Sequence, residues 1–265
     1  MPDSLQPVPI DTYLASPGAA EPHLRRLFSP CSPRVIFDIG ACEGEDSIRY
    51  SRLFPRSQVY AFEPLPTNQA IIRHNFAHHH ADRAELVPLA LSDHIGPATF
   101  HVSSGRPAHL FGPEEWNYGN KSSSLLAPAS SAPMHGWIEF PEKIEVACDT
   151  LDAFCRRRGI ARVDFIHMDV QGAEALVLAG AAHMLPHVGA LWLEVSDQEL
   201  YAGQKLRPHL EGILRAQGFR LVAEDRRAIE GDQFYVNSRS LGLARYAICD
   251  TLARIRRAIR ASLCR

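Results

Sequence analysis

The chain has 265 residues, of which 46% are hydrophobic and 22% charged, and its formal net charge is −2. These values are ordinary for a soluble globular protein, and the length suffices for one large α/β domain or two small ones. A net charge so close to zero gives no electrostatic reason to expect a nucleic-acid partner.

The apolar pattern predicts an alternation of strands and helices. Residues 1–33 are proline-rich, and we expect an extended lead-in with one short helix near 23–28. The expected strands are Val35–Ile39, Gln58–Glu63, Glu85–Leu91, Ala98–Val102, Ile144–Ala147, Val163–Val170, Ala190–Val195, Phe219–Ala223 and Gln233–Val236. The expected helices are Gly44–Leu53, Thr67–Ala77, Thr150–Arg158, Ala173–Ala181 and Lys205–Gln217. Such alternation predicts one α/β domain over residues 34–238, with a mostly parallel, Rossmann-like sheet.

Three details of this pattern can be tested by a structure. We expect Ala98–Val102 to form a hairpin with the strand before it, and Thr67 to cap its helix. The last two strands should close the sheet as an antiparallel pair.

The segment from Val35 to Glu63 is the most informative part of the chain. An apolar run that contains Asp38 is followed by Gly40 and Gly44, and a second apolar run ends at Glu63. This order of strand, glycine turn, helix and strand with a terminal carboxylate is typical of nucleotide-binding α/β units. We expect Glu63 to hold the two hydroxyls of a ribose.

The charge of the glycine loop indicates which nucleotide is bound. The loop carries Glu43, Glu45 and Asp46 and no lysine. Acids favour the first turn of any helix, yet three of them would repel a pyrophosphate. We therefore expect a cationic cofactor, and S-adenosylmethionine carries both an ammonium and a sulfonium.

Residues 103–143 interrupt the regular pattern with glycine, proline and serine around aromatic side chains such as Trp116 and Trp137. An irregular segment of this length is usually functional, and we expect a lid or acceptor loop. Ser122, Ser123 and Ser124 are candidate contacts to acceptor hydroxyls. A disordered insertion is the alternative, which the aromatics disfavour.

The C-terminal segment 239–265 contains seven arginines and one acidic residue. Apolar residues recur at helical spacing between 241 and 264, so we expect a basic amphipathic helix. It would suit a membrane surface or a partner protein, or pack on the body of the protein with its arginines solvated. The triplet His78–His80 is more typical of a solvated helix end than of a metal site.

The six cysteines, at positions 31, 42, 148, 155, 249 and 264, form neither a CxxC pair nor a zinc-binding spacing. We interpret them as reduced thiols. The first residues lack the basic and apolar regions of a signal peptide, and no apolar run reaches the roughly 18–20 residues of a membrane span. These features predict a cytoplasmic location.

Several blocks, in order, resemble the FkbM family of S-adenosylmethionine-dependent methyltransferases. They are FDIGACEGEDS (37–47), YAFEPLPTN (60–68), LALSD (89–93), KSSSL (121–125), TLDAF (150–154), DFIHMDVQGAEALVLAGA (164–181) and LEVSDQELYAG (193–203). The resemblance covers about Val35 to Asn237. It implies a seven-stranded class I methyltransferase sheet and methyl transfer to a hydroxyl of a sugar, glycolipid or small metabolite. The family often has lysine where this chain has His167, and glutamate or glutamine at the position of Gln171.

The resemblance and the pattern together give a set of candidate site residues. Those expected to bind the cofactor are Asp38, Gly40, Ala41, Gly44, Ser47, Glu63, Pro64, Leu91 and Ser92. The catalytic candidates are Asp169, His167 and Glu194, at the ends of neighbouring strands.

Each catalytic candidate has a second interpretation. Asp169 either takes the hydroxyl proton or balances cofactor charge, and it could also cap the helix Ala173–Ala181. His167, two residues earlier and expected on the same strand face, is either a base or a core residue. Glu194 faces the same cleft or joins a buried network. A metal site formed by all three is possible, but their spacing does not demand it.

Two other functions remain open at this stage. N-methylation of a small amine would need no strong base. A non-catalytic binding module is disfavoured by the intact set of Asp38, Gly40, Gly44, Glu63 and Asp169.

Overall fold

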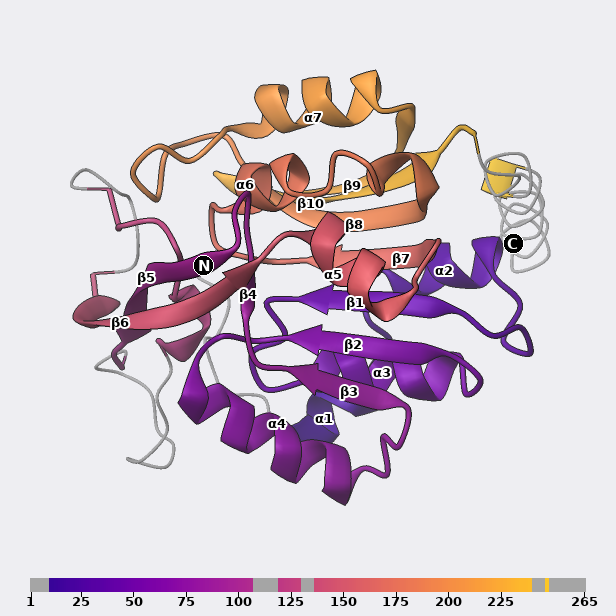
Figure 1. Ribbon diagram of the computed structural model, residues 1–265, viewed down its shortest axis with the longest axis horizontal. Coiled ribbons are helices and arrows are strands. Elements are labelled where there is room, and N and C mark those ends of the chain that lie inside the picture. The colour runs from indigo at the N-terminus through magenta and orange to yellow at the C-terminus, as the bar shows by residue number, and fades with distance from the viewer. Residues whose placement is uncertain (1–9, 107–118, 130–135, 240–245, 248–265) are drawn as a thin grey trace, which may run out of the picture.

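The computed structural model describes residues 10–106, 119–129, 136–239 and 246–247. Its centre is a seven-stranded sheet with the order β3-β2-β1-β7-β8-β10-β9 (Figure 1). The strands are β1 (Val35–Ile39), β2 (Gln58–Phe62), β3 (Ala84–Val87), β7 (Val163–Met168), β8 (Val188–Ser196), β9 (Phe219–Arg226) and β10 (Glu230–Asn237). β10 runs antiparallel to both β8 and β9, whereas the other pairings are parallel. The predicted mostly parallel sheet with an antiparallel closing strand is confirmed.

Helices cover both faces of this sheet. One face packs against α5 (Leu151–Arg158), α6 (Glu174–Ala179) and α7 (Arg207–Ala216), and the other against α2 (Glu21–Leu27), α3 (Glu45–Leu53) and α4 (Pro66–His78). Strand residues alternate between the two cores: Phe37 contributes to the first and Ile36 to the second. This period of two is expected for strands buried on both faces.

A three-stranded sheet with the order β4-β6-β5 lies beyond the carboxyl ends of β1, β2 and β3 (Figure 1). Its strands are β4 (Ala90–Leu91), β5 (Gly96–Ser104) and β6 (Glu139–Asp149). The expected single strand Glu85–Leu91 is therefore two strands in different sheets. Pro88 lacks an N–H group, which explains why the first ladder ends at Val87.

The hairpin expected for Ala98–Val102 is also wrong, because β5 pairs antiparallel with β6 rather than with the strand before it. Likewise, Thr67 does not cap α4, which begins at Pro66 after Leu65 without a side-chain cap. By contrast, Thr150 does cap α5: its hydroxyl accepts a hydrogen bond from the amide of Ala153 at 3.1 Å.

The lead-in is helical rather than extended over its described part. α1 (Ile10–Ala15) packs against α3, and α2 buries Leu24 and Leu27 in the core beneath the sheet. Two further one-turn 3₁₀ helices occur at Asn120–Ser122 and Leu185–His187. The first of them lies within the expected irregular segment.

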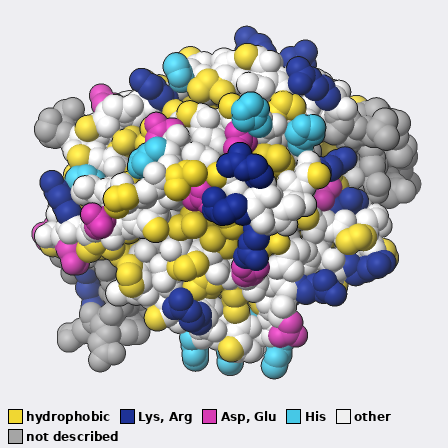
Figure 2. All heavy atoms as spheres, in the orientation of Figure 1, with side chains coloured by type: hydrophobic (Ala, Val, Ile, Leu, Met, Phe, Trp, Pro, Cys, Tyr) yellow, Lys and Arg dark blue, Asp and Glu magenta, His cyan; other side chains and the backbone are white. Residues whose placement is uncertain are grey.

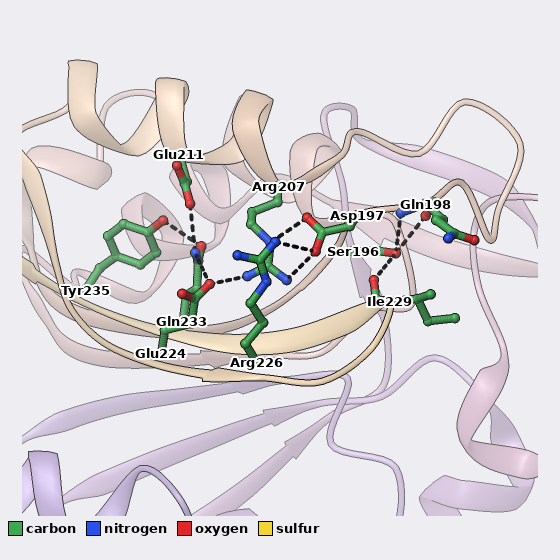
Figure 3. Close-up of polar contacts among 10 residues, drawn as sticks. All are labelled: Ser196, Asp197, Gln198, Arg207, Glu211, Glu224, Arg226, Ile229, Gln233 and Tyr235. Carbon is green, nitrogen blue, oxygen red and sulfur yellow. Dashed lines mark hydrogen bonds and ion pairs between the residues drawn. The ribbon is translucent and has the colours of Figure 1, made fainter.

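A polar network joins α7 to the two closing strands (Figure 3). Arg207, only 5% exposed, donates to Asp197 at 2.7 Å and pairs with Glu224 of β9. Gln233 of β10 donates to Glu224 at 3.0 Å and to Glu211 of α7 at 2.8 Å. The network anchors both strands of the β9–β10 hairpin to α7.

Some expectations fall on residues outside the described ranges. Trp116 and the helix predicted over 241–264, apart from Tyr246 and Ala247, are among them.

Among the described residues, no helix is long and apolar enough to cross a membrane. Histidines gather at the lower edge of the face in Figure 2, over α4, where the rings of His74 and His78 stack 6.1 Å apart. In the described part of the chain, no group of three potential ligands could hold a metal ion.

Candidate active site

Two cavities lie at the carboxyl edge of the large sheet. The first lies between the ends of β1, β2 and β7 and the small sheet, with about 540 Å³ of empty space that is open to solvent. Its lining residues are Ile39, Gly40, Cys42, Phe62, Glu63, Pro64, Asn68, Leu89, Ala90, Leu91, Phe100, Asn120, Lys121, Ser123, Leu125, Asp169, Val170, Gln171 and Ala173. This position is where open α/β sheets bind their ligands.

Glu63 is the buried carboxylate of this first cavity. It follows β2 and is 4% exposed. One carboxylate oxygen accepts a hydrogen bond from the amide of Cys42 at 2.9 Å, and the other from the amide of Leu65 at 2.8 Å. Burial raises the pKa of Glu63 to about 7, although these amides oppose the shift. The side chain of Asn68 also donates to this carboxylate. Because each carboxylate oxygen has two lone pairs, the group can still accept a donor from a ligand.

Asn120 adds an unsatisfied acceptor to the same cavity. Its amide nitrogen donates to Glu43 at 3.1 Å, but its Oδ1 is buried and has no hydrogen-bond partner in the described part of the chain. A buried acceptor without a partner costs about 1–3 kcal/mol. A ligand that places an N–H or O–H group beside Asn120 would remove this penalty.

The glycines of the loop are required by close packing. Gly40 has φ +84°, and a Cβ there would lie 1.8 Å from the backbone oxygen of Asp169. Gly44 has φ +81°, and its Cβ would meet the Phe76 ring at 2.8 Å. Only Gly40 of the two lines the cavity. The glycines thus bring the ends of β1 and β7 together and let α4 approach the loop.

The acidic residues of the loop do not face the cavity. Glu45 forms an ion pair with Lys121, and Glu43 accepts from Asn120. Asp46 accepts from the hydroxyl of Tyr13 at 2.8 Å. These contacts attach the loop to neighbouring segments. Because these acids contact other protein groups, their charge is weaker support for a cationic cofactor than the sequence suggested.

The second cavity lies beside the first, at the ends of β7, β8 and β10. Its lining residues are Ser122, Ile138, Gln171, Glu194, Leu200, Tyr201, Arg227, Ala228, Ile229 and Glu230. Ser196 holds one wall in place, because its hydroxyl lies 3.1 Å from the backbone oxygen of Ile229 (Figure 3). Arg227 is the only cation among the described residues that line this cavity, and it is paired with Asp232.

Gln171 forms part of the wall of both cavities. Its Nε2 donates to Asp169 at 2.7 Å and to Glu194 at 3.0 Å. Its Oε1 accepts from the hydroxyl of Tyr201 at 2.9 Å, and its backbone oxygen accepts from Ser124 at 2.7 Å. Gln171 has φ +53°, which is uncommon for a residue with a side chain and is often found at functional sites.

The three catalytic candidates are separated by the structure. Asp169 lines the first cavity and Glu194 the second. Burial and the negative charge of Asp169 raise the pKa of Glu194 well above its usual value. His167 lines neither of these two cavities, and its Nδ1 lies 3.1 Å from the hydroxyl of Tyr50 on α3. It therefore lies against α3.

Asp169 also does not cap the following helix. The residue before α6 is Ala173, which makes no side-chain cap, and the amides of Val170 and Gly172 instead donate to Glu174. Of the serines proposed as acceptor contacts, Ser122 lines the second cavity and Ser123 the first. Ser124 is occupied by its bond to Gln171.

The residues expected to bind the cofactor are likewise divided. Four of them line the first cavity: Gly40, Glu63, Pro64 and Leu91. Five line neither cavity: Asp38, Ala41, Gly44, Ser47 and Ser92. Asp38 points to the α3 side, where the hydroxyl of Ser47 donates to it at 2.6 Å. Asp38 and Ser47 therefore support the glycine loop from the α3 side.

Sequence reasoning did not identify Asn120, Tyr201 or Glu230 as site residues. Asn120 and Tyr201 do lie in or beside blocks that carry the family resemblance, but a block does not show which of its side chains faces a cavity. Glu230 follows the turn between two strands, and nothing local in the sequence distinguishes it from the other acids of the chain.

Comparison with known proteins identifies the family. The model of the methyltransferase FkbM domain matches residues 38–221, which is more than half of the chain. The chain belongs to the FkbM methyltransferase family. The resemblance predicted from the sequence blocks is confirmed, and the protein is a methyltransferase.

Curated relatives extend along most of the chain. The 2-O-methyltransferase NoeI of Sinorhizobium fredii is 37% identical over 77% of this chain and 80% of its own length. The 31-O-demethyl-FK506 methyltransferase FkbM of Streptomyces tacrolimicus is 28% identical over 76% and 78%. The methyltransferase sdnD of Sordaria araneosa is 26% identical over 77% and 80%.

Proposed function

We propose that this FkbM-family enzyme transfers a methyl group from S-adenosylmethionine to a hydroxyl of a sugar, a glycolipid or a small metabolite. The observation that carries the proposal is the buried carboxylate of Glu63, held by two backbone amides in a cavity at the end of β2. A ribose presents two adjacent hydroxyl donors, and this carboxylate keeps acceptor capacity beyond its donors from the protein. The identity to a 2-O-methyltransferase supports oxygen as the acceptor atom.

The other residues of the first cavity fit the same cofactor. Ala90, Leu91 and Phe100 provide an apolar surface for a purine ring. Asn120 supplies the unsatisfied acceptor, which an amino group of the cofactor can use. When bound, S-adenosylmethionine supplies an activated methyl group, so that the protein needs only to align the acceptor and remove its proton.

We assign the acceptor to the second cavity. It shares Gln171 with the wall of the first cavity, and Ile138, Leu200 and Ile229 provide apolar surface. Glu194 and Glu230 contribute carboxyl groups to the lining, whereas Arg227 is already paired with Asp232. A neutral acceptor with several hydroxyls suits such a lining better than an anionic one, because carboxylates accept hydrogen bonds and repel anions.

Glu194 is the base in this proposal. It lines the cavity assigned to the acceptor, and its raised pKa makes it a better proton acceptor than an ordinary glutamate. Gln171 keeps this carboxylate in place, because its amide nitrogen donates to Glu194 as well as to Asp169. The hydroxyl proton passes to an Oε atom of Glu194 as the acceptor oxygen attacks.

The proposal is tested with the purified chain. Titration calorimetry should show binding of S-adenosylhomocysteine and no comparable binding of NAD. Labelled S-adenosylmethionine should then transfer its methyl group to members of a panel of neutral monosaccharides and hydroxylated lactones, to give base-stable methyl ethers. Binding of NAD in preference to S-adenosylhomocysteine would contradict the cofactor assignment, and methylation of amines alone would contradict the oxygen assignment.

A further inference from the structure

His167 lies between two carboxylates that flank the glycine loop. Its Nδ1 is 3.6 Å from Oδ1 of Asp38, near the end of β1, and 3.8 Å from Oδ2 of Asp46, in the first turn of α3. The same nitrogen is 3.1 Å from the hydroxyl oxygen of Tyr50, one turn farther along α3. One imidazole thus contacts residues at both ends of the loop 39–44.

That loop forms one wall of the first cavity. Gly40 and Cys42 line it, and the amide of Cys42 donates to Glu63. A shift of the loop would therefore move both the cavity wall and one of the two donors that hold the Glu63 carboxylate.

We propose that His167 is a positioning residue: its imidazolium holds Asp38 and Asp46 together and so keeps the glycine loop in the shape that binds the cofactor. The inference concerns the same site as the proposed function and rests on it for the identity of the ligand. It does not make His167 a base, because the imidazole lines neither of the two cavities.

The same cluster reaches the N-terminal helix. Asp46 also accepts from the hydroxyl of Tyr13 on α1 and pairs with Arg49 at 3.3 Å. Arg49 in turn donates to the backbone oxygen of Tyr13 at 2.9 Å. Loss of charge on His167 would leave Asp46 with Tyr13 and Arg49 alone, and the end of β1 would lose its link to Asp46.

The charges around the imidazole favour its protonated form. Asp38, Asp46, Asp169 and Asp232 face it from β1, α3, the end of β7 and β10, while the hydroxyl of Tyr50 contacts it directly. Burial acts to lower the pKa of His167, but the carboxylates of Asp46 and Asp38 outweigh it and raise the pKa above the ordinary value of 6.5. Burial likewise raises the pKa of Asp38, to about 7, against the opposing charge of His167.

The sign of the pH effect follows from these directions. A group whose pKa is raised by folding stabilises the protein below its unfolded pKa, and this stabilisation is lost as the pH rises through the folded pKa. Asp38 loses its contribution as the pH rises from its ordinary value of 3.8 to about 7. His167 loses its contribution as the pH rises from 6.5 through its raised pKa, so above neutrality the predicted fall in stability and loop order comes from His167.

The test compares His167→Lys and His167→Gln with the wild type and with His183→Gln, which changes an exposed histidine beyond α6. Unfolding midpoints of the cofactor-free protein are measured between about pH 6 and pH 9, where an imidazole titrates and an ammonium does not. Affinity for S-adenosylhomocysteine is measured by calorimetry near pH 6.5, where the histidine is charged.

His167→Gln should lower the midpoint by roughly 5 °C or more, because it leaves buried carboxylates without their cation. It should also lower the affinity for S-adenosylhomocysteine by about 10-fold or more. His167→Lys should keep both values near those of the wild type at low pH, and should lose less stability as the pH rises. His183→Gln should match the wild type throughout.

The inference is overturned if His167→Gln matches His183→Gln in both measurements. If His167→Gln does not fold, His167→Lys decides: a pH dependence of its midpoint equal to that of the wild type also overturns the inference. If the wild type binds no S-adenosylhomocysteine, the proposed function fails instead, and the unfolding midpoints still judge the role of His167.

Discussion

Asp169 and Glu194 share a single hydrogen-bond donor, the side-chain nitrogen of Gln171, which lies 2.7 Å from the first carboxylate and 3.0 Å from the second. One carboxylate belongs to the cavity that we assign to the cofactor, and the other to the cavity that we assign to the acceptor. An amide nitrogen has two hydrogens, so both bonds can form at once. One side chain thereby links the two carboxylates.

The first prediction concerns this shared donor. Gln171→Ala should lower kcat because it leaves two neighbouring carboxylates without their common hydrogen bond. Gln171→Gly should lower kcat to a similar degree but unfold at a higher temperature than the alanine variant, since a residue with a side chain at φ +53° is strained by about 1–2 kcal/mol. Steady-state rates and thermal unfolding measure the two effects. Full activity in either variant would show that the shared donor is not needed.

The second prediction concerns cofactor affinity. Glu63→Gln keeps the size of the side chain but replaces one of its two acceptor oxygens with a donor that opposes a backbone amide. Affinity for S-adenosylhomocysteine should fall by about 1–3 kcal/mol, the usual cost of unpaired buried groups. Glu145→Gln, at an exposed carboxylate of β6, is the control and should bind normally. Equal binding by the two variants in calorimetry would exclude Glu63 from the cofactor site.

Sequence patterns predicted the region from Val35 to Glu63 well because its information is local. Apolar runs define β1 and β2, the glycines mark the turn after β1, and Glu63 follows the end of β2 in the first cavity. The two-residue period of a strand led us to expect His167 and Asp169 on one strand face, and this prediction was wrong. β7 ends at Met168, so the period of two does not extend to Asp169.

Contacts between distant segments were not predictable. The hydroxyl of Tyr201 lies 2.8 Å from the backbone oxygen of Ser122, 79 positions away, and Lys121 pairs with Glu45, 76 positions away. A sequence does not show such pairings without the fold. The charge of the glycine loop was misread for this reason, since its acids face partners that come from other segments.

A third prediction compares two glycines with left-handed backbones. Gly40→Ala should be severely destabilising, because its Cβ would lie 1.8 Å from the backbone oxygen of Asp169 and φ is +84°. Gly203→Ala has a similar φ of +80° but nothing within 4 Å of the new Cβ. It should cost only the backbone strain of about 1–2 kcal/mol. Denaturant unfolding of both variants separates strain from collision, and equal losses would argue against the close approach of β1 and β7.

A fourth prediction locates the acceptor. Ile138 lines the second cavity, so Ile138→Ala should raise the acceptor KM while the affinity for S-adenosylhomocysteine stays unchanged. Ile95→Ala, at a side chain that is 63% exposed and lines neither cavity, should leave both values unchanged. If Ile138→Ala lowers the affinity for S-adenosylhomocysteine and leaves the acceptor KM unchanged, the second cavity is not the acceptor site.

The last prediction distinguishes the two carboxylates by pH. A general base must be ionised, so activity should rise with pH through the raised pKa of Glu194, above the ordinary value of 4.5. Glu194→Gln should lower kcat by roughly 10²–10⁴-fold and abolish this acidic limb. Asp169→Asn removes a negative charge that helps to raise the pKa of Glu194, so the acidic limb should persist and move to lower pH. The comparison uses kcat at saturating acceptor over a range of pH.

If Asp169→Asn abolishes the acidic limb and Glu194→Gln retains it, then Asp169 takes the proton and our assignment is reversed. If both variants keep near-full turnover, neither carboxylate is the base, and alignment of the acceptor in the second cavity carries the reaction.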